Sequence, residues 1–570
     1  MASRGSRDYV AIALRYAQDV TRKKIVAGFW VRLACKRFLK DYKRKTSARW
    51  FPYYFDEWHA CDVCDFIEKL PHVEGEWASP TLILEPWQIF ILVNVFGFRQ
   101  AFGDAQGKRR FNTVYIEVGR KNAKSTLTSG ICLYCLTCED EPGPQVKTAA
   151  TTGDQARIVF RVAKAMVEKT PDLGENFQLD AMANAIVCRL NMGSIQPINA
   201  KASSQDGLNP HLAVIDELHA HNDRKLFDVL KSARGSRKNP LSWYITTAGY
   251  NLTTVCYEQR VLLTKILQGI FQADHYFGII FTLDEGDDPF DESVWIKANP
   301  NLGVSVSLKE MRTYAQEARE SPQSEGEFKT KRCNLWLNAA NAWLSMTDWE
   351  KCADQSLQLA DMKAYPAYIG GDLADRNDVT CLAVVFDRGD DLVAFVWHYL
   401  PKEIVQAAAD RTSAHYVAWA AQGLFILTEG DMTDYSAIEA HVRQLFNDFD
   451  VRHITFDQYG SAQLTSNLVD DGLPAQVMTK NAKNFTDPAK ELEARVQVRR
   501  FRWTGDPVLR WMASNCVVTK GVDGSILPKK ENKDSPNKID GVDALLNGIS
   551  GYLQDRDETF ESVYSQGAIH

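Results

Sequence analysis

The segment Tyr115–Thr126 constrains the fold of this chain more than any other. Its sequence, Y-I-E-V-G-R-K-N-A-K-S-T, predicts a buried strand, a tight polar loop and the first turn of a helix. That order is typical of a phosphate-binding loop, where backbone N–H groups and a helix N-terminus face a polyphosphate. Lys124 would then reach the β- and γ-phosphates of a nucleotide, and Ser125 would be a ligand of Mg²⁺.

The loop departs from the usual G-x-x-x-x-G-K-[ST] pattern, because Val118 and Ala123 stand at the two glycine positions. Taken alone, it could equally be a basic turn. A second segment, Leu212–Glu217, is an apolar strand that ends in two carboxylates. Asp216 would hold Mg²⁺ through water, and Glu217 would polarise the attacking water. Solvated acids also end many strands, but the two segments in this order predict an ATPase.

Apolar strands alternate with helical stretches between residues 112 and 250, at 112–118, 146–151, 194–198, 212–216 and 242–247. This alternation predicts a parallel sheet flanked by helices, with ligands at the carboxyl ends of the strands. Lys124 and Asp216 both follow such ends. Thr246 and Thr247 stand at the tip of the last strand, where they would sense the γ-phosphate or be ordinary β-branched strand residues.

A different pattern begins near residue 367, where three strands follow one another at 367–373, 379–386 and 392–399. The first ends in Asp372, and a later strand ends in Asp457. A helix near the end of the chain carries Asp540 and Asp543, which share one face because they are three residues apart. Acids on two strand ends and one helix can converge on two divalent ions, which suits phosphodiester hydrolysis. The order predicts an RNase H-like nuclease, although each acid could instead be a turn or cap residue.

Length and apolar content bound the class of protein. A chain of 570 residues is too long for one core, so two or three domains are expected. The best membrane candidate, Ile89–Phe98, is much shorter than the roughly 20 residues that span a bilayer, and it predicts a buried helix. The N-terminus lacks the apolar core of a signal peptide, so an intracellular protein is expected. Two groups of cysteines predict buried apolar side chains rather than zinc ligands: Cys61 with Cys64, and Cys132 with Cys135 and Cys138.

Charge is unevenly distributed, although the net charge is −7. Residues 1–50 hold fourteen Lys or Arg and three Asp, which predicts either a polyanion-binding surface or a solvated helical face. Arg495–Trp503 alternates basic and apolar residues and predicts a strand with one cationic face. A DNA-facing surface is expected there, extended by a polar loop with Lys529, Lys530, Lys533 and Lys538.

With both halves laid out, the chain resembles the large terminase subunit of tailed bacteriophages, of the HK97-like type, over nearly its whole length. The motifs that carry the resemblance are Glu85–Gln88, Val118–Ser125, Ala149–Gln155, Val214–Glu217, Thr246–Ala248, Trp295–Pro300, Gly370–Asp372, Phe456–Asp457 and Lys538–Asp540. Phosphate loops of this family lack the first glycine and carry Arg before the Lys, so the departure at Val118 supports the resemblance.

The resemblance implies an α/β protein that works as a DNA-packaging motor. An N-terminal P-loop ATPase domain of the type with an added catalytic glutamate (the ASCE type), built on a parallel-type sheet, would drive double-stranded DNA into a procapsid. A C-terminal RNase H-like α/β domain would cut the concatemeric genome. The expected parts are a basic helical segment of the ATPase region at 1–75, the P-loop ATPase domain with a linker subdomain at 76–350, the nuclease domain at 351–556 and a flexible tail at 557–570.

By motif match, the resemblance assigns roles to single residues. Gln88 would contact adenine, Arg120 would lie against the γ-phosphate, and Thr246 and Thr247 would couple hydrolysis to domain motion. The residues that hold ATP would be Gln88, Gly119, Arg120, Lys121, Asn122, Ala123, Lys124, Ser125, Thr126, Asp216, Thr246 and Thr247, with Ser125 and Asp216 on its Mg²⁺. Two Mg²⁺ or Mn²⁺ ions would be held by Asp372, Asp457, Asp540 and Asp543, and the choice of main third ligand between the last two stays open. The catalytic residues would be Glu217, Arg120, Asp372, Asp457 and Asp540.

Two details of the motor depend on geometry. Ala123 replaces the commoner glycine, and its methyl group is tolerable only if the backbone there keeps a negative φ; otherwise weak ATP binding is expected. The arginine that acts in trans on a neighbouring subunit could be Arg224, Arg234 or Arg237.

The resemblance also implies partners: double-stranded DNA, the small terminase subunit, the portal protein of the procapsid and further copies in a docked ring, with no membrane. The site of action would be the host cell cytoplasm, transiently on the procapsid. One alternative is a helicase–nuclease of repair or restriction, which should carry a second motor domain where this chain shows the strand–Asp pattern. The other is a non-catalytic DNA-binding scaffold with a degenerate P-loop.

Overall fold

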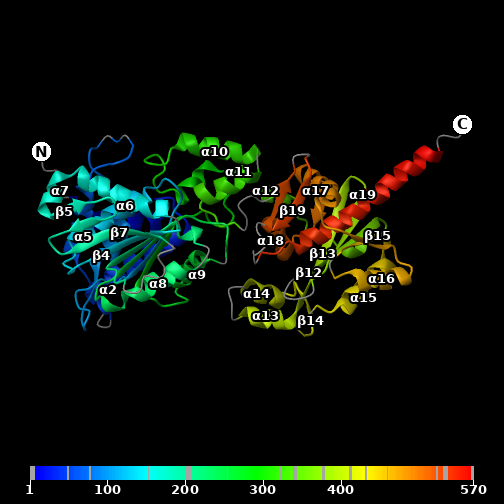
Figure 1. The fold of residues 1–570 in the computed structure, drawn as a ribbon, viewed down its shortest axis with the longest axis horizontal. Coiled ribbons are helices and arrows are strands. Elements are labelled where there is room, and N and C mark those ends of the chain that lie inside the picture. Colours follow the sequence, from blue (N-terminus) through cyan, green and yellow to red (C-terminus); the bar gives the residue numbers. More distant parts are fainter. Residues whose placement is uncertain are drawn as a thin grey trace. The chain divides into compact units, whose positions relative to one another are not determined.

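The chain folds into two compact units, drawn in Figure 1. The first comprises Met1–Gln316 with Glu327–Trp336, and the second comprises Glu317–Gly326 with Leu337–His570. The computed structural model describes residues 7–47, 51–75, 77, 79–151, 153–199, 208–221, 224–252, 254–320, 322–337, 343–374, 379–409, 414–430, 433–458, 460–521, 524–530 and 537–566.

The first unit is built on an eight-stranded sheet in the order β10-β3-β9-β8-β4-β7-β6-β5. The six strands from β10 to β7 are parallel, and β6 and β5 extend the edge in antiparallel pairing. The strands are β3 Thr113–Glu117, β4 Gln145–Ala150, β5 Leu179–Ala181, β6 Ile186–Cys188, β7 Gly193–Asn199, β8 Leu212–Asp216, β9 Leu241–Thr246 and β10 Tyr276–Ile280. All five strands expected in this region are confirmed, whereas β5, β6 and β10 were missed.

Helices flank this sheet (Figure 1), and the short strands β1 Tyr53–Phe55 and β2 Phe98–Gln100 form a separate antiparallel pair. The helices are α1 Tyr9–Thr21, α2 Phe29–Ser47, α3 Glu57–Glu68, α4 Pro86–Gly97, α5 Lys124–Thr137, α6 Gly153–Glu168, α7 Pro171–Asn176, α8 Lys225–Ser232, α9 Val255–Leu267 and α10 Leu308–Glu320. Among the helices that the structure describes, none is long and apolar enough to cross a membrane.

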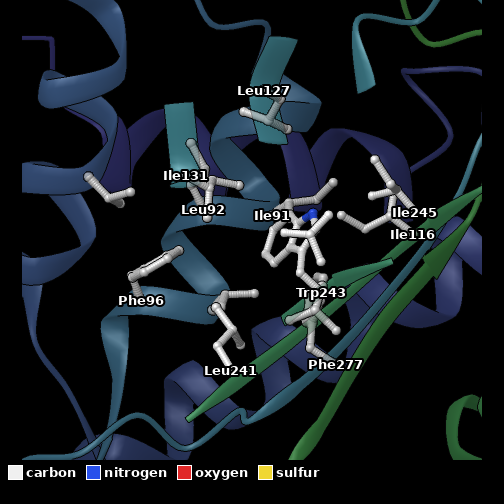
Figure 2. Close-up of a cluster of buried hydrophobic side chains, with 14 of the residues drawn as sticks. Ile91, Leu92, Phe96, Ile116, Leu127, Ile131, Leu241, Trp243, Ile245 and Phe277 are labelled. Carbon is white, nitrogen blue, oxygen red and sulfur yellow. The ribbon is translucent and has the colours of Figure 1, made fainter. Parts of the chain in front are cut away.

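Helix α4 is the centre of the core. It is apolar on all sides, and every residue from Trp87 to Gly97 is buried, as expected of a helix packed between other elements. Helices α1 and α3 pack against it, and Figure 2 shows its Ile91, Leu92 and Phe96 gathered with sheet and α5 side chains that include Ile116, Leu127, Ile131 and Trp243. Pro86 at the first turn and the bond from the Glu85 backbone N–H to Gln88 Oε1 (2.9 Å) fix where the helix begins.

The basic N-terminal segment is helical, as expected, and part of its charge serves the fold. Arg37 donates to the carbonyl oxygens of Ala273 (3.1 Å) and Tyr276 (2.8 Å) beside β10. Arg7 pairs with Glu68, and Arg32 pairs with Asp284 at 3.3 Å. These arginines therefore bind groups of their own unit rather than presenting an open cationic surface. Arg4 and Arg49 lie outside the described residues.

The second unit holds a mixed sheet in the order β14-β13-β12-β11-β15-β16, with β17 paired to β13. Strands β11, β12 and β13 are antiparallel neighbours, and β15 and β16 run parallel to β11. The strands are β11 Pro366–Asp372, β12 Thr380–Arg388, β13 Asp391–Pro401, β14 Ile426–Thr428, β15 Asp450–Asp457, β16 Ala475–Met478 and β17 Phe501–Trp503, with the separate hairpin β18 Cys516–Lys520 and β19 Ile526–Lys530. The expected order is confirmed: three successive strands, a later strand that ends in Asp457, and a terminal helix that carries acids.

Helices surround this second sheet, and the long α19 lies across β11, β12 and β15 (Figure 1). They are α12 Met346–Lys351, α13 Lys402–Ala409, α14 Ala414–Ala421, α15 Tyr435–Asp448, α16 Ala462–Asp470, α17 Ala482–Gln497, α18 Pro507–Asn515 and α19 Asp540–Gln566, preceded by α11 Pro322–Glu327. Helix α19 continues to Gln566, through most of the stretch expected to form a tail, and residues 567–570 lie outside the described part.

One expectation for this unit is wrong. Arg495–Trp503 does not form a single strand, because α17 runs to Gln497 and only Phe501–Trp503 is extended. Val496 is buried together with Leu492, Ala489 and Phe485, which is helical spacing, so its apolar character belongs to a helix face and not to a strand. Of the lysines expected to extend a cationic surface, Lys533 lies outside the described residues.

Candidate active sites

The phosphate-binding loop lies between β3 and α5 in the first unit, as the sequence predicted. Its backbone is left-handed at Lys121 (φ 68°) and at Ala123 (φ 55°). The condition of a negative φ at Ala123 is therefore not met. An alanine in this region costs roughly 1–2 kcal/mol relative to right-handed backbone, because its Cβ approaches the following carbonyl oxygen. Ala123 is strained where the usual glycine would not be.

Lys124 begins α5 and is buried. Its Nζ donates to the carbonyl oxygen of Val118 at 3.0 Å and lies 3.5 Å from that of Gly119. Burial lowers the pKa of Lys124, while the negative charges of Glu217 and Asp216 oppose that shift. The ammonium group therefore lies on the loop's own backbone and close to both carboxylates of β8.

Hydrogen bonds to residues distant in the sequence hold the phosphate-binding loop in place. The amide of Asn122 donates to Gly119 O (3.0 Å) and to Asn299 Oδ1 (3.0 Å), and its own Oδ1 accepts from the Asn301 N–H (3.0 Å). Trp87 Nε1 donates to Asn301 Oδ1 at 2.6 Å. The motifs at 85–88, 118–125 and 295–300 thus meet at one place. Asn299 and Asn301 were not assigned a role from the sequence.

The two acids at the end of β8 differ in their environments. Asp216 is buried, and its Oδ1 accepts the backbone N–H of Glu217 at 2.8 Å; burial and the charge of Glu217 raise the pKa of Asp216 to about 7. Burial raises the pKa of Glu217, but the positive charge of Lys124 and the nearby His219 outweigh burial and lower that pKa to about 2. Glu217 is therefore ionised at neutral pH and can accept a hydrogen bond from a water molecule.

Thr246 and Thr247 are both buried at the tip of β9, beside this pair. The backbone N–H of His219 donates to Thr246 Oγ1 at 3.0 Å, and the His219 ring lies close to the same oxygen. The sequence analysis did not single out His219, although it stands only two residues after Glu217.

A cavity of about 550 Å³ opens over the loop, which is within the range of small-molecule sites. Of the residues predicted to hold ATP or act on it, those that line the cavity are Gln88, Arg120, Lys121, Ala123, Lys124, Ser125, Thr126 and Glu217. The others, Gly119, Asn122, Asp216, Thr246 and Thr247, are not among the lining residues. The position of Gln88 in the same cavity as the loop is compatible with a contact to the nucleotide base.

The candidates for a trans-acting arginine separate by their contacts. Arg237 donates to the carbonyl oxygens of Asn209 (3.1 Å), Pro142 (2.9 Å) and Gly143 (2.7 Å), and pairs with Glu141. It is fully engaged within its own unit. Arg224 is half exposed and pairs with Asp228 and Glu258 at the surface, so it is the better candidate. The side chain of Arg234 is outside the described part.

The predicted nuclease acids come together in the second unit. Strands β11 and β15 are parallel neighbours with Gly371 opposite Phe456, so Asp372 and Asp457 end the two strands side by side. Helix α19 approaches β11 very closely, because a Cβ on Gly370 would lie only 2.0 Å from the carbonyl oxygen of Ala544. The absence of a side chain at Gly370 therefore lets the first turn of α19 bring Asp540 and Asp543 to the strand ends.

Repulsion between these acids is visible in their proton affinity. Burial, followed by the charges of Asp543 and Asp540, raises the pKa of Asp372 well above its usual value, and burial raises that of Asp543. Lys480, which follows β16, contacts Asp543; burial opposes its charge, but Asp543 and Asp372 raise its pKa. Lys480 could not be predicted from the sequence, since only the pairing of β16 with β15 brings it to the site.

The donor set suits hard divalent cations, because carboxylate oxygens are the ligands that Mg²⁺ and Mn²⁺ prefer. Asp543 Oδ1 is buried and makes no hydrogen bond within the described residues. A buried carboxylate oxygen in a cluster of like charges fits a metal ligand better than it fits a turn or a cap.

A third group, Cys135, Glu139 and His211, has the spacing of metal ligands in the first unit. Glu139 is already bound by the buried Arg109, and its other oxygen lies 2.8 Å from His211 Nε2. Arg109 already neutralises the carboxylate of Glu139, so this group is better explained as an internal ion-pair network. Cys132 and Cys135 are buried on α5, as expected.

Comparison with known proteins covers both units. Residues 86–264 match the family described as "Terminase large subunit, ATPase domain", and residues 271–555 match "Terminase large subunit, endonuclease domain". The terminase large subunit of Enterobacteria phage HK97 is 26% identical over 497 residues, which cover 85% of this chain and 94% of that protein. Protein YmfN of Escherichia coli (strain K12) is 33% identical over 375 residues, which cover 64% of this chain and 82% of YmfN.

Among solved structures, the crystal structure of the HK97 bacteriophage large terminase is similar, with 24% sequence identity and a TM-score of 0.42. The similarity covers 86% of this chain and 98% of that one. The helicase–nuclease and scaffold alternatives find no support among the relatives of the chain.

Proposed function

This chain belongs to the terminase large subunit family, and on that premise we propose which of its residues hydrolyse ATP and which cut DNA. It carries the ATPase and endonuclease domains of the family, which act in the packaging and cutting of DNA, and these domains use a nucleotide and divalent metal ions. The proposal concerns the roles of individual residues, the number of metal ions and the partners.

In the ATPase unit, we assign the phosphates of ATP to the loop at Lys124 and the start of α5. The helix N-terminus and the ammonium group supply positive charge there. Ser125 and Asp216 would hold Mg²⁺, and Glu217 would accept a hydrogen bond from the attacking water. The low pKa of Glu217 supports that role, because the group is ionised at neutral pH. Arg120 and Gln88 would contact the γ-phosphate and the base, respectively.

In the nuclease unit, Asp372, Asp457 and the first turn of α19 would hold two divalent ions. When bound, such ions supply Lewis acidity that activates water and stabilises the leaving oxygen in phosphodiester hydrolysis. The observation that carries this assignment is the convergence of carboxylates from three elements, with the pKa of Asp372 raised by its neighbours. Asp540 and Asp543 are both buried in the first turn of α19, and both would supply the third carboxylate ligand.

The family also suggests what the motor works with. We propose that this chain forms a ring on the portal protein of a procapsid, receives double-stranded DNA with the help of a small terminase subunit, and works in the host cell cytoplasm. Arg224 would act on the ATP of a neighbouring copy. The pairing of a motor domain with a nuclease domain in one chain supports this arrangement, since a packaging cycle needs both translocation and cutting.

The test compares Glu217→Gln with Asp372→Ala, each assayed for ATP hydrolysis and for plasmid cleavage with Mg²⁺ or Mn²⁺. Glu217→Gln should bind ATP and lose hydrolysis by about 100-fold or more, because the carboxylate that polarises water is gone. Asp372→Ala should lose cleavage and keep hydrolysis. The activity that each variant retains shows that it is folded: plasmid cleavage for Glu217→Gln and ATP hydrolysis for Asp372→Ala. ATP turnover by Glu217→Gln within a few-fold of the unchanged protein would reject the ATPase assignment, and retained cleavage by Asp372→Ala would reject the nuclease assignment.

A further inference from the structure

His219 lies between the acid-bearing end of β8 and the tip of β9. It belongs to the short 3₁₀ turn Leu218–Ala220, which follows directly after Glu217. Its ring nitrogen Nδ1 is 3.1 Å from Glu217 Oε2 and 3.1 Å from Thr246 Oγ1. The contact with Thr246 has hydrogen-bond geometry, whereas Glu217 Oε2 is buried and makes no hydrogen bond within the described residues. The same nitrogen is 3.4 Å from Thr247 Oγ1. One nitrogen atom thus faces three oxygen atoms that come from two different strands.

The backbone of His219 is tied to β9 independently of the bond that Nδ1 makes. The His219 backbone N–H donates to Thr246 Oγ1 at 3.0 Å, which ties the turn to β9. Gly249, just beyond the strand tip, passes so close that a Cβ added there would lie 3.1 Å from the Cβ of His219. Movement of the β9 tip must therefore carry His219 with it or break these contacts.

A protonated Nδ1 carries a single hydrogen, so its three neighbours compete for one bond. The carboxylate of Glu217 can only accept, whereas the threonine hydroxyls can also donate elsewhere, as Thr246 Oγ1 does to the carbonyl oxygen of Thr247 at 2.8 Å. Because Nδ1 lies 3.1 Å from two of these oxygens and 3.4 Å from the third, a small shift of the β9 tip would change which oxygen it binds. That exchange would hold or release the side chain of Glu217.

The contacts continue beyond β9 to the end of the first unit. The backbone N–H of Ala248 donates to Asn334 Oδ1 at 2.7 Å, and the amide of Asn334 donates to the carbonyl oxygen of Phe281 at 2.6 Å. Asn334 belongs to Glu327–Trp336, the last segment of the first unit before the chain enters the second. The position of the β9 tip is therefore linked on one side to Glu217 and on the other to that segment.

We propose that His219 is a positioning residue that sets the orientation of Glu217 according to the position of the β9 tip. In the arrangement seen here, Nδ1 binds the threonine hydroxyls. In the other arrangement it passes to Glu217 and holds the carboxylate, so that Glu217 meets the attacking water only when β9 is correctly placed. This inference rests on the proposed role of Glu217 in hydrolysis.

The first experiment replaces His219 by Ala, Asn and Gln and measures kcat and KM for ATP. An asparagine amide nitrogen lies where Nδ1 was, and a glutamine amide nitrogen lies where Nε2 was. His219→Ala should lose about tenfold in kcat with KM little changed, because a misplaced catalytic group slows chemistry more than binding. His219→Asn should recover to within about threefold of the unchanged protein, and His219→Gln should not.

Plasmid cleavage by the second unit and the melting temperature control for folding, and His441→Ala controls for the loss of an imidazole in the other unit. If His219→Ala does not fold, the comparison of Asn with Gln still decides. A normal kcat in His219→Ala, or equal rescue by Asn and Gln, would overturn the inference.

A second measurement combines His219→Ala with Thr246→Val. If the two side chains act through one shared bond, the double variant should lose about as much kcat as the more damaging single variant. If the fold-losses in kcat of the two single variants multiply in the double variant, the two side chains act independently and the positioning role of His219 is overturned. The variant Glu217→Gln distinguishes a failure of the proposed function from a failure of this inference. If Glu217→Gln hydrolyses ATP, the proposed function is wrong. If Glu217→Gln is inactive and His219→Ala is normal, only the positioning role of His219 is rejected.

Discussion

The two candidate active sites balance their charges in opposite ways. In the ATPase unit, two acids share a site with the buried Lys124, and one acid of the pair keeps a low pKa. In the nuclease unit, four acids are grouped around Lys480, and the pKa of Asp372 is raised well above its usual value. The first site can keep its shape with its own residues, whereas the second stores repulsion that divalent cations would relieve.

The largest effect should come from removing one acid of the repulsive cluster. Asp457→Asn should lower plasmid cleavage by about a thousandfold or more, since it removes a predicted metal ligand, and ATP hydrolysis should be unchanged. Asp450→Asn is a matched control, because Asp450 is an exposed acid at the opposite end of the same strand. Cleavage by Asp457→Asn at the rate of Asp450→Asn would show that the cluster is not the cutting site.

Lys480 provides the next test of how the second unit balances the charge of its acids. Lys480→Met should destabilise the metal-free second unit by about 1–3 kcal/mol, because Asp543 then loses its cationic partner. Saturating Mg²⁺ should recover most of that loss. The measurement is chemical unfolding with EDTA and with Mg²⁺. Equal destabilisation in both conditions would mean that Lys480 is a packing residue and not a counter-charge.

The dependence of stability on pH should differ between the units. A carboxyl group whose pKa is raised by folding binds more protons in the folded state than in the unfolded state. Stability from Asp372 and Asp543 therefore falls as the pH rises from near 4 through their raised values. In EDTA, the second unit should melt about 2–4 °C higher near pH 5.5 than near pH 8.

Calorimetry with Asp372→Asn supplies the control for this prediction. The variant should flatten the pH dependence, and Mg²⁺ should stabilise the unchanged protein more at the higher pH, where protons compete less for the carboxylates. An identical pH profile in Asp372→Asn would assign the effect to other groups.

The smallest effect concerns the ATPase loop. Ala123→Gly should stabilise the loop by about 1 kcal/mol and tighten ATP binding severalfold, because glycine adopts the left-handed backbone without strain. Ala163→Gly, inside helix α6, should instead destabilise the protein by about 1 kcal/mol. Binding of ATP that is no tighter in Ala123→Gly would mean that the loop changes conformation on binding.

The sequence predicted the sites better than their surroundings. Asp216, Asp372 and Asp457 could be predicted because each polar side chain follows directly after an apolar strand. Lys124 could be predicted because it begins the helix that follows such a strand. Their supporting residues could not be found in that way, because they are distant in the chain: Asn299 reaches the loop from another segment, and Lys480 arrives through strand pairing.

Backbone conformation was the second property that could not be predicted from the sequence. The sequence showed that Ala123 replaces a glycine, but only the structure gives its positive φ. The stretch 495–503 misled for a related reason. Its apolar residues alternate over a short distance, as they do in a strand. Val496 is nevertheless buried together with Leu492, four residues earlier, which shows that residues 495–497 belong to helix α17.

Gly370 has a consequence for anyone seeking an allele that separates the two activities. A methyl group there has no room between β11 and α19, so Gly370→Ala would push the helix away while leaving all four acids in the chain. Such a variant would carry an intact set of ligands that no longer converge. A survey that scored only charged positions would count it as wild type, although its defect lies in the distance between two backbones.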